Sequence, residues 1–190
     1  MVSGLKGLKG LKGLDFCTFS TCSFNSKVLI YLEKINNELK SMILTNKTNS
    51  EDTDFQNLVT ELDRDLKIRD GKEHVFYSQF NKTDKIKHVL VAYDQDIAVG
   101  CGALKEYSND TMEVKRMFVR LNDRNKGIAS IILRELETWS KELGYKKCIL
   151  ETGKKQPEAI RLYEKNQYML IPNYGPYKDV ENSVCFEKVL

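Results

Sequence analysis

The sequence has 190 residues, 41% of them hydrophobic, which is enough to bury one core and suggests about one domain plus an appendage. Lys and Arg total 30 against 27 Asp and Glu, and this near balance argues against a nucleic-acid partner. No apolar run approaches the ~18 residues of a membrane span. The five cysteines lack metal-site spacing, so we expect reduced thiols in a soluble, cytoplasmic protein without a membrane partner.

The first 41 residues differ in composition from the rest of the chain. Gly4–Leu14 repeats Gly-Leu-Lys with a period of three, which fits neither helix nor strand, so we expect disorder there. Ser26–Met42 spaces its apolar residues as an amphipathic helix does. Polar residues interrupt Leu14–Phe24 and argue against a secretory signal. We interpret residues 1–41 as an extension and 42–190 as the domain; the alternative is that the helix packs on the domain or on a partner.

Apolar residues recurring every three or four positions predict a first helix in the domain, with Asn49 or Ser50 as its N-cap and its end before Gly71. Its buried face would comprise Phe55, Leu58, Val59 and Leu62. The helix is also acidic between Glu51 and Asp65. That surface could hold a polyamine, although an exposed acidic helix face is the more ordinary interpretation.

The remaining elements follow from apolar periodicity and turn residues. In chain order we expect a short strand from Met42, a helix at Val75–Phe80, strands at Lys87–Tyr93, Asp96–Lys105 and Thr111–Arg120, a helix at Ile128–Leu143, a strand at Lys147–Thr152, a helix at Pro157–Asn166, and strands at Gln167–Ile171 and Ser183–Val189. Short turns join three of these strands into an antiparallel meander, whereas the strand after the crossover helix should pair in parallel. The expected fold class is α/β: a mixed, mostly antiparallel sheet with helices on both faces.

The helix at Ile128–Leu143 is strongly amphipathic. We expect Ile128, Ile131, Ile132, Leu136, Trp139 and Leu143 on its buried face, Ser130, Arg134, Glu137 and Lys141 on its polar face, and Gly144 just beyond its end. The preceding segment Arg124-Asn125-Lys126-Gly127-Ile128-Ala129 places a glycine and two basic side chains at the helix start. Free N–H groups and the helix dipole favour an anion there, so this segment predicts a phosphate cradle.

Three motifs together resemble the GNAT acetyltransferase superfamily, in particular its small, bacterial-type, single-domain members. They are Met112–Val119, Arg124–Ala129 and Pro157–Lys165, and the order of elements matches from about Met42 to Leu190. The resemblance implies the GNAT fold, in which a bulge splays the central strand from its parallel neighbour. It also implies transfer of an acetyl group from acetyl-CoA to an amine in a ternary complex, with acetyl-CoA as co-substrate and no metal.

The resemblance also assigns roles to individual residues. The cofactor-binding residues would be Met117, Phe118 and Val119 along the pantetheine arm, Arg124, Asn125, Lys126, Gly127, Ile128 and Ala129 at the pyrophosphate, and Gln156 and Tyr163 nearby. Tyr163 would protonate the departing thiolate, and the N–H of Phe118 or Val119 would bind the oxyanion. Glu113 matches the position of a general base; alternatively it is a strand carboxylate paired with Lys115 or Lys105.

Two departures from the family pattern are visible. Gln156 stands where many relatives have Asn, which leaves its contact with the pantetheine open. Gln167 stands where many have Gly, so the left-handed cap conformation would pass to Asn166. His74 and His88 lie far from the motifs and predict no metal site. Tyr93, Tyr174 and Tyr177 either shape the acceptor pocket or, for the last two, belong to a turn-rich loop.

Two functions remain open from the sequence. The first is an N-acetyltransferase acting on a primary amine of a small molecule or protein. The second is a catalytically inactive module of the same fold that senses acyl-CoA or docks on a partner. Arg124, Gly127, Ala129 and Tyr163 favour the enzyme. The sequence is compatible with a monomer or a homodimer.

Overall fold

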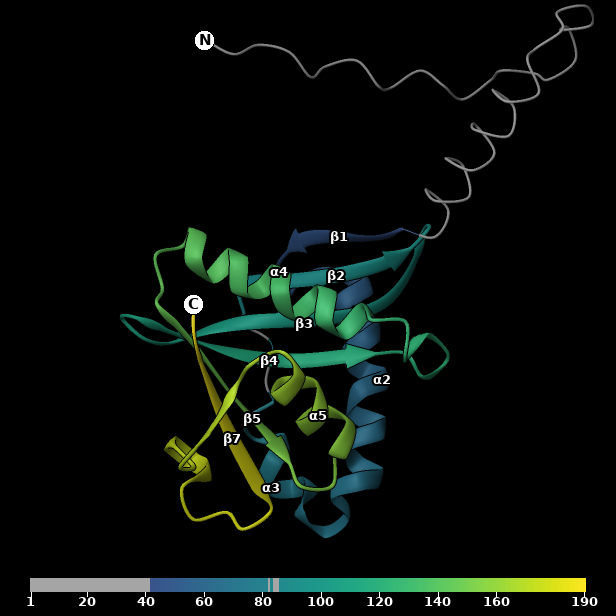
Figure 1. Ribbon diagram of the computed structural model, residues 1–190. Helices are drawn as coiled ribbons and strands as arrows, with labels where there is room; N and C mark the ends of the chain where they lie inside the picture. The colour runs from purple at the N-terminus through teal and green to yellow at the C-terminus, as the bar shows by residue number, and fades with distance from the viewer. Residues whose placement is uncertain (1–41, 82, 84–85) are drawn as a thin grey trace, which may run out of the picture. The chain divides into compact units, whose positions relative to one another are not determined.

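The computed structural model describes residues 42–81, 83 and 86–190, so the expectations for residues 1–41 lie outside the described residues. The elements, in chain order (Figure 1), are β1 (Ile43–Thr48), α2 (Thr53–Asp70), a 3₁₀ turn (Gly71–Glu73), α3 (His74–Ser78), β2 (His88–Asp94), β3 (Ile97–Ser108), β4 (Thr111–Val119), a 3₁₀ turn (Leu121–Asp123), α4 (Ile128–Glu142), β5 (Lys147–Gly153), α5 (Pro157–Lys165), β6 (Met169–Ile171), a 3₁₀ turn (Gly175–Tyr177) and β7 (Ser183–Val189). The predicted fold class is confirmed.

The strands form one seven-stranded sheet in the order β1-β2-β3-β4-β5-β7-β6. Every neighbouring pair is antiparallel except β4 and β5, which are parallel, as the crossover through α4 predicts. The parallel pairing covers only Thr111–Glu113 of β4 against Lys147–Ile149 of β5. Beyond it the two strands diverge, so the sheet contains the splayed parallel pair expected of the GNAT fold.

Helices cover both faces of the sheet, with α4 and α5 on one face and α2 on the other (Figure 1). Alternate residues of β2 divide between two cores: Leu90 and Ala92 pack with α4, whereas Val89 and Val91 pack with α2. Each core side chain is withdrawn from water, which stabilises the fold by about 1.5–3 kcal/mol for a fully buried Leu or Val. Strands β3 and β4 therefore lie between two helical layers.

A bulge in β4 lies just beyond the last parallel pair, Glu113 with Ile149. Cys101 pairs with Phe118 and Ala103 with Lys115, so Arg116 and Met117 together oppose Gly102. Arg116 has φ +57°, a left-handed conformation that bends the strand. A Cβ on Gly102 would lie 2.6 Å from the Met117 sulfur and 2.8 Å from Leu136 Cδ1, so a larger residue here would have to displace these side chains.

Two predicted helix caps are wrong. Asp52, not Asn49 or Ser50, caps α2, since its carboxylate accepts the Phe55 N–H at 2.9 Å. The left-handed residue after α5 is Gln167 itself, at φ +68°, rather than Asn166. Because Gln167 completes the turn that ends α5, β6 begins later than predicted.

The predicted polar face of α4 is also wrong at one position. Glu137 is buried, and its Oε2 pairs with the Lys188 ammonium of β7 at 2.6 Å. A carboxylate can occupy a buried face only with such a partner, which helix periodicity does not reveal. Gly144 ends the helix at φ +91°, as predicted. Among the described residues, no helix is long and apolar enough to cross a membrane.

Candidate active site

A groove of about 440 Å³ runs between the N-terminus of α4 and α5. We call it the outer groove. Its lining includes the backbone or side chains of Met117, Phe118, Val119, Arg124, Asn125, Gly127, Ile128, Ala129, Gln156 and Tyr163, that is, all predicted cofactor-binding residues except Lys126. The sequence prediction missed Ser130, Arg161 and Lys165, which also line it. Arg161 and Lys165 lie one turn apart on α5, and this spacing is the sequence signal that could have identified them.

The N-terminus of α4 has the form of an anion site. Asn125 and Gly127 adopt left-handed conformations with φ +65° and +82°, and the helix begins at Ile128. The first N–H groups of a helix lack intrahelical partners and lie at the positive end of its dipole. A Cβ on Gly127 would meet no atom within 4 Å, so open space lies beside this backbone. These features fit the pyrophosphate of coenzyme A.

The two basic side chains of this loop differ in orientation. The Arg124 Nε donates to the Val119 carbonyl at 3.0 Å, which holds its guanidinium in the groove wall. The Lys126 ammonium instead lies 2.7 Å from the Asp123 carboxylate and 4.0 Å from that of Asp94. Lys126 therefore does not line the outer groove with the other predicted cofactor-binding residues.

A second, smaller cavity of about 90 Å³ lies where β4 and β5 diverge. We call it the inner cavity. Its lining comprises Leu62, Leu66 and Asp70 of α2, Tyr77 of α3, Asn81, Val114–Met117 of β4, Glu151–Gly153 of β5, Gln156, Tyr163 and Tyr177. Leu62, Met117, Gln156 and Tyr163 line both the inner cavity and the outer groove. The two spaces therefore meet at the splay of the sheet.

Tyr163 lies at this meeting point. It is buried, 5% exposed, and its ring packs against Tyr168 and Phe186 with centroids 5.8 and 5.9 Å away. Burial, and secondly the charge of Glu151, raise the pKa of its phenol. The hydroxyl therefore keeps its proton at neutral pH and is a donor. Gln156 precedes α5 without capping it through its side chain, which leaves the amide for a ligand.

Glu113 is engaged by its neighbours. Its Oε1 accepts the Tyr174 hydroxyl at 3.1 Å and lies 3.5 Å from the Lys115 ammonium. The same ammonium donates to the Tyr177 hydroxyl at 3.1 Å. Glu113 lies beside the inner cavity without lining it. These contacts favour the interpretation of Glu113 as a paired strand carboxylate.

Glu151 is the acidic residue that the sequence prediction missed. It lines the inner cavity, and its Oε1 accepts the Ser183 hydroxyl at 2.6 Å. Burial raises the pKa of its carboxyl to about 7, against the lowering effects of Ser183 and Lys115. The available signal was a lone carboxylate in the apolar run Cys148–Thr152, which continues past the point of strand divergence.

Several other candidates lie elsewhere. Of the three tyrosines, Tyr177 lines the inner cavity and Tyr174 contacts Glu113, but Tyr93 donates to Asp54 at 3.0 Å and lines neither space. Asp63 contacts Arg116 at 2.6 Å, so part of the acidic helix face serves internal pairs. Cys101, Cys148 and Cys185 are buried free thiols. No group of three metal-ligating side chains occurs among residues 42–81, 83 and 86–190.

The fold is that of the coenzyme A-dependent acyltransferases, and comparison with known proteins agrees. The Acetyltransferase (GNAT) family profile matches residues 53–168. An IAA acetyltransferase of Azospirillum brasilense is 33% identical over 137 residues, which are 70% of this chain and 88% of that protein. The chain belongs to the GNAT acetyltransferase family, whose reaction is acetyl-CoA-dependent acyl transfer.

Solved structures show the same fold with its ligand. A PaiA N-acetyltransferase of Thermoplasma acidophilum in complex with coenzyme A has a TM-score of 0.59 and 18% identity, covering 78% of this chain and 99% of that one. A GNAT family acetyltransferase of Elizabethkingia anophelis with acetyl-CoA bound has a TM-score of 0.56 and 19% identity, covering 78% and 98%.

Proposed function

We propose that this protein transfers the acetyl group of acetyl-CoA directly to a primary amine of a small molecule or a protein, within a ternary complex. The observation that carries the proposal is the meeting of the outer groove and the inner cavity at Tyr163, Met117 and Gln156. The outer groove fits acetyl-CoA, and the inner cavity can admit an amine. The Tyr163 hydroxyl, a proton donor, lies where the two spaces meet.

In this proposal the donor lies in the outer groove. The N–H groups at the start of α4 and the Arg124 guanidinium hold the pyrophosphate through charge-assisted hydrogen bonds. The pantetheine arm runs along Met117–Val119, where backbone amides pair with it as with an added strand. The N–H of Phe118 or Val119 stabilises the oxyanion, and Tyr163 protonates the departing thiolate.

The test is thiol release from acetyl-CoA over a panel of primary amines, measured together with cofactor binding. We expect Tyr163→Phe to lower kcat by about 10² or more, with cofactor affinity little changed, because only the proton donor is removed. Tyr107→Phe, on an exposed tyrosine, is the matched control and should retain full turnover. Tight cofactor binding without turnover of any amine would contradict the proposal and support the sensing module instead.

A further inference from the structure

Glu151 and Tyr163 reach the inner cavity from opposite faces of the sheet. Cys148 and Leu150 of β5 pack in the core beneath α4 and α5, so alternation directs Glu151 toward the α2 face. Tyr163 comes from α5 on the other side. Both line the cavity where the donor and acceptor spaces meet. A base and an acid on either side of one reacting centre are what amine acetylation needs.

A short hydrogen-bonded chain fixes the Glu151 carboxylate. The Ser183 Oγ donates to its Oε1 at 2.6 Å, and the same Oγ lies 3.3 Å from the Tyr77 hydroxyl. Ser183 is 4% exposed, so this contact is shielded from competing water. Ser183 is the first residue of β7 and pairs with Gly153 at the end of β5. Its contact therefore holds one carboxylate oxygen of Glu151 in place close to this end of β5.

The charged and titratable groups around Glu151 come from every neighbouring element. They are Lys115 and Glu113 of β4, Asp70 of α2, Tyr77 of α3, Tyr163 of α5, Tyr177, and Ser183 and Cys185 of β7. The charged side chains that line the cavity itself are Asp70, Lys115, Arg116 and Glu151, and the Arg116 guanidinium is paired with Asp63 at 2.6 Å. A primary amine in neutral water is largely its ammonium form, and it must lose a proton before it can attack.

We infer, on the basis of the proposed function, that Glu151 is the general base for an acceptor that arrives as a primary ammonium ion, and that Ser183 positions it. The carboxylate takes one N–H proton of the ammonium. The freed nitrogen lone pair then forms the C–N bond, and the C–S bond breaks. Tyr163 gives its proton to the thiolate and recovers one from the nitrogen. The third proton stays on the product amide, and Glu151 releases its own to solvent.

The experiment is the pH dependence of kcat/KM with one accepted amine. The wild-type profile should rise through an acidic limb with its midpoint near pH 7, where Glu151 ionises. Glu151→Gln should lower kcat/KM at pH 8 by about 10² and abolish this limb, with cofactor affinity retained. An unchanged limb in this variant would overturn the assignment.

Ser183→Ala tests the positioning role without removing the base. The Ser183 hydroxyl lowers the pKa of the Glu151 carboxyl, so its loss should move the acidic limb to higher pH. Ser183→Thr keeps a hydroxyl and should restore the wild-type midpoint. A merely structural serine would change the rate at every pH equally, and that result would refute the positioning role.

Two further variants separate the alternatives. Glu113→Gln should keep the acidic limb of the pH profile. If Glu113→Gln abolished this limb and Glu151→Gln did not, the general base would be Glu113. Glu187→Gln, on β7 with its carboxylate paired to Lys147 at 3.1 Å, is the matched control for a lost carboxylate. A wild-type protein that acetylates no amine would refute the proposed function and this inference together. An active wild type whose kcat/KM and pH profile are unchanged by Glu151→Gln would refute the inference alone.

Discussion

Single residues decide what the loop before α4 can bind. Arg124 is held in the groove wall through the Val119 carbonyl, whereas Lys126 is turned to Asp123. The sequence alone does not distinguish the two cations, because both lie in the short segment just before Gly127. Only the side-chain geometry distinguishes them.

Arg124→Ala should therefore weaken coenzyme A binding by roughly 10- to 100-fold, the loss of a charge-assisted hydrogen bond of about 1.5–3 kcal/mol. Lys126→Ala should change the affinity by about twofold or less, since its charge is paired and exposed. Isothermal calorimetry at fixed ionic strength measures both. Equal losses in the two variants would show that the pyrophosphate contacts both side chains.

Glu151 should also change how stability depends on pH. Its folded-state pKa of about 7 lies above the ordinary 4.5, so the folded protein binds the extra proton between these values. Stability is then lost as pH rises through this window, because the charged form is disfavoured in the fold. By pH 8 the loss is on the order of 3 kcal/mol.

Glu151→Gln should remove this loss. We expect the variant to unfold at a higher denaturant concentration than the wild type at pH 8, and at a similar one at pH 4.5, where the wild-type carboxyl is largely protonated in the folded state. Chemical unfolding at the two pH values measures the difference. A variant that is less stable than the wild type at pH 8 would contradict the raised pKa.

At the scale of elements, four charged side chains connect α2, the loop before α4 and α5. Arg69 lies 3.1 Å from Asp65 and 2.6 Å from Glu158, and Arg124 lies 3.5 Å and 3.7 Å from the same two carboxylates. We call Asp65, Arg69, Arg124 and Glu158 the interhelix ion network. In the proposed complex, this network would compete with the pyrophosphate for Arg124, and its carboxylates would repel the pyrophosphate.

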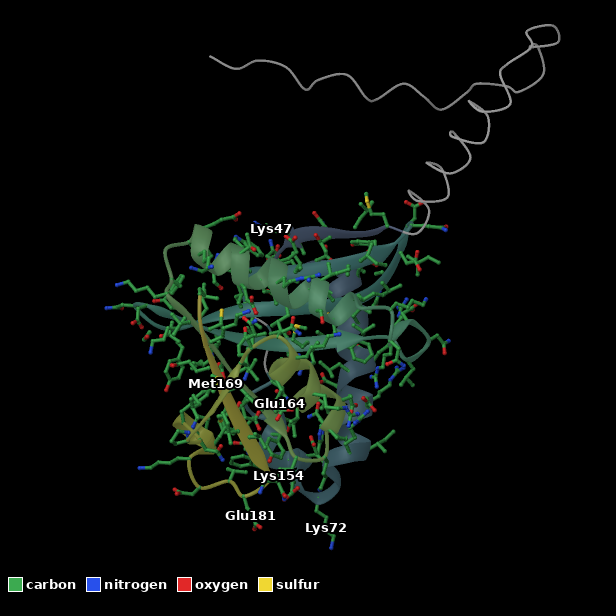
Figure 2. All side chains as sticks on the ribbon, viewed as in Figure 1. Lys47, Lys72, Lys154, Glu164, Met169 and Glu181 are labelled. Atoms are coloured by element: carbon green, nitrogen blue, oxygen red, sulfur yellow. The ribbon has the colours of Figure 1, made fainter. Side chains whose placement is uncertain are left out.

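Glu158→Gln should therefore tighten coenzyme A binding by about two- to fivefold at low salt, because an exposed ion pair is worth about 0.2–1 kcal/mol. The difference should shrink at high salt, where charges are screened. Glu164→Gln, on the same helix and labelled in Figure 2, is the matched control and should not alter the affinity. Weaker binding of the Glu158 variant would mean that the interhelix ion network helps to form the site.

One ion pair and one hydrogen bond connect the loops at the end of the molecule beside the inner cavity. Figure 2 shows Lys72, Lys154 and Glu181 at this end. The Lys155 ammonium lies 2.9 Å from the Glu73 carboxylate, which also accepts the Asn182 amide. The turn after α2 is thus tied to the loops before α5 and β7, which keeps the groups around Glu151 together.

At the scale of the whole molecule, the described elements from α2 to β7 supply two buried clusters, and the family profile matches residues 53–168, which lie inside the predicted domain 42–190. We therefore expect a chain lacking residues 1–41 to keep its thermal midpoint within a few degrees and its cofactor affinity within about twofold. Differential scanning calorimetry and binding titration check this. A large drop in either would show that the extension is part of the domain.

Much of the architecture could be predicted because periodicity and turn residues are local signals. The elements from β2 to β5, the parallel pairing and the loop Arg124–Ala129 all follow from them. Glu137 and Glu151 could not be placed, because a buried carboxylate depends on partners distant in sequence, Lys188 and Ser183. The motif match predicts a donor site, whereas residues beside the inner cavity become visible only in the tertiary structure.

The divergence of β4 from β5 has a consequence for the protein without its donor. Past Glu113 and Ile149 the facing backbones of the two strands no longer pair with each other, so the sheet has an open edge at its centre. Such edges are templates for pairing with another chain. In the proposed complex the cofactor arm would pair with this edge, so we expect slower amide exchange across Lys115–Val119 when the cofactor binds. We expect the cofactor-free protein to be the form most prone to aggregation.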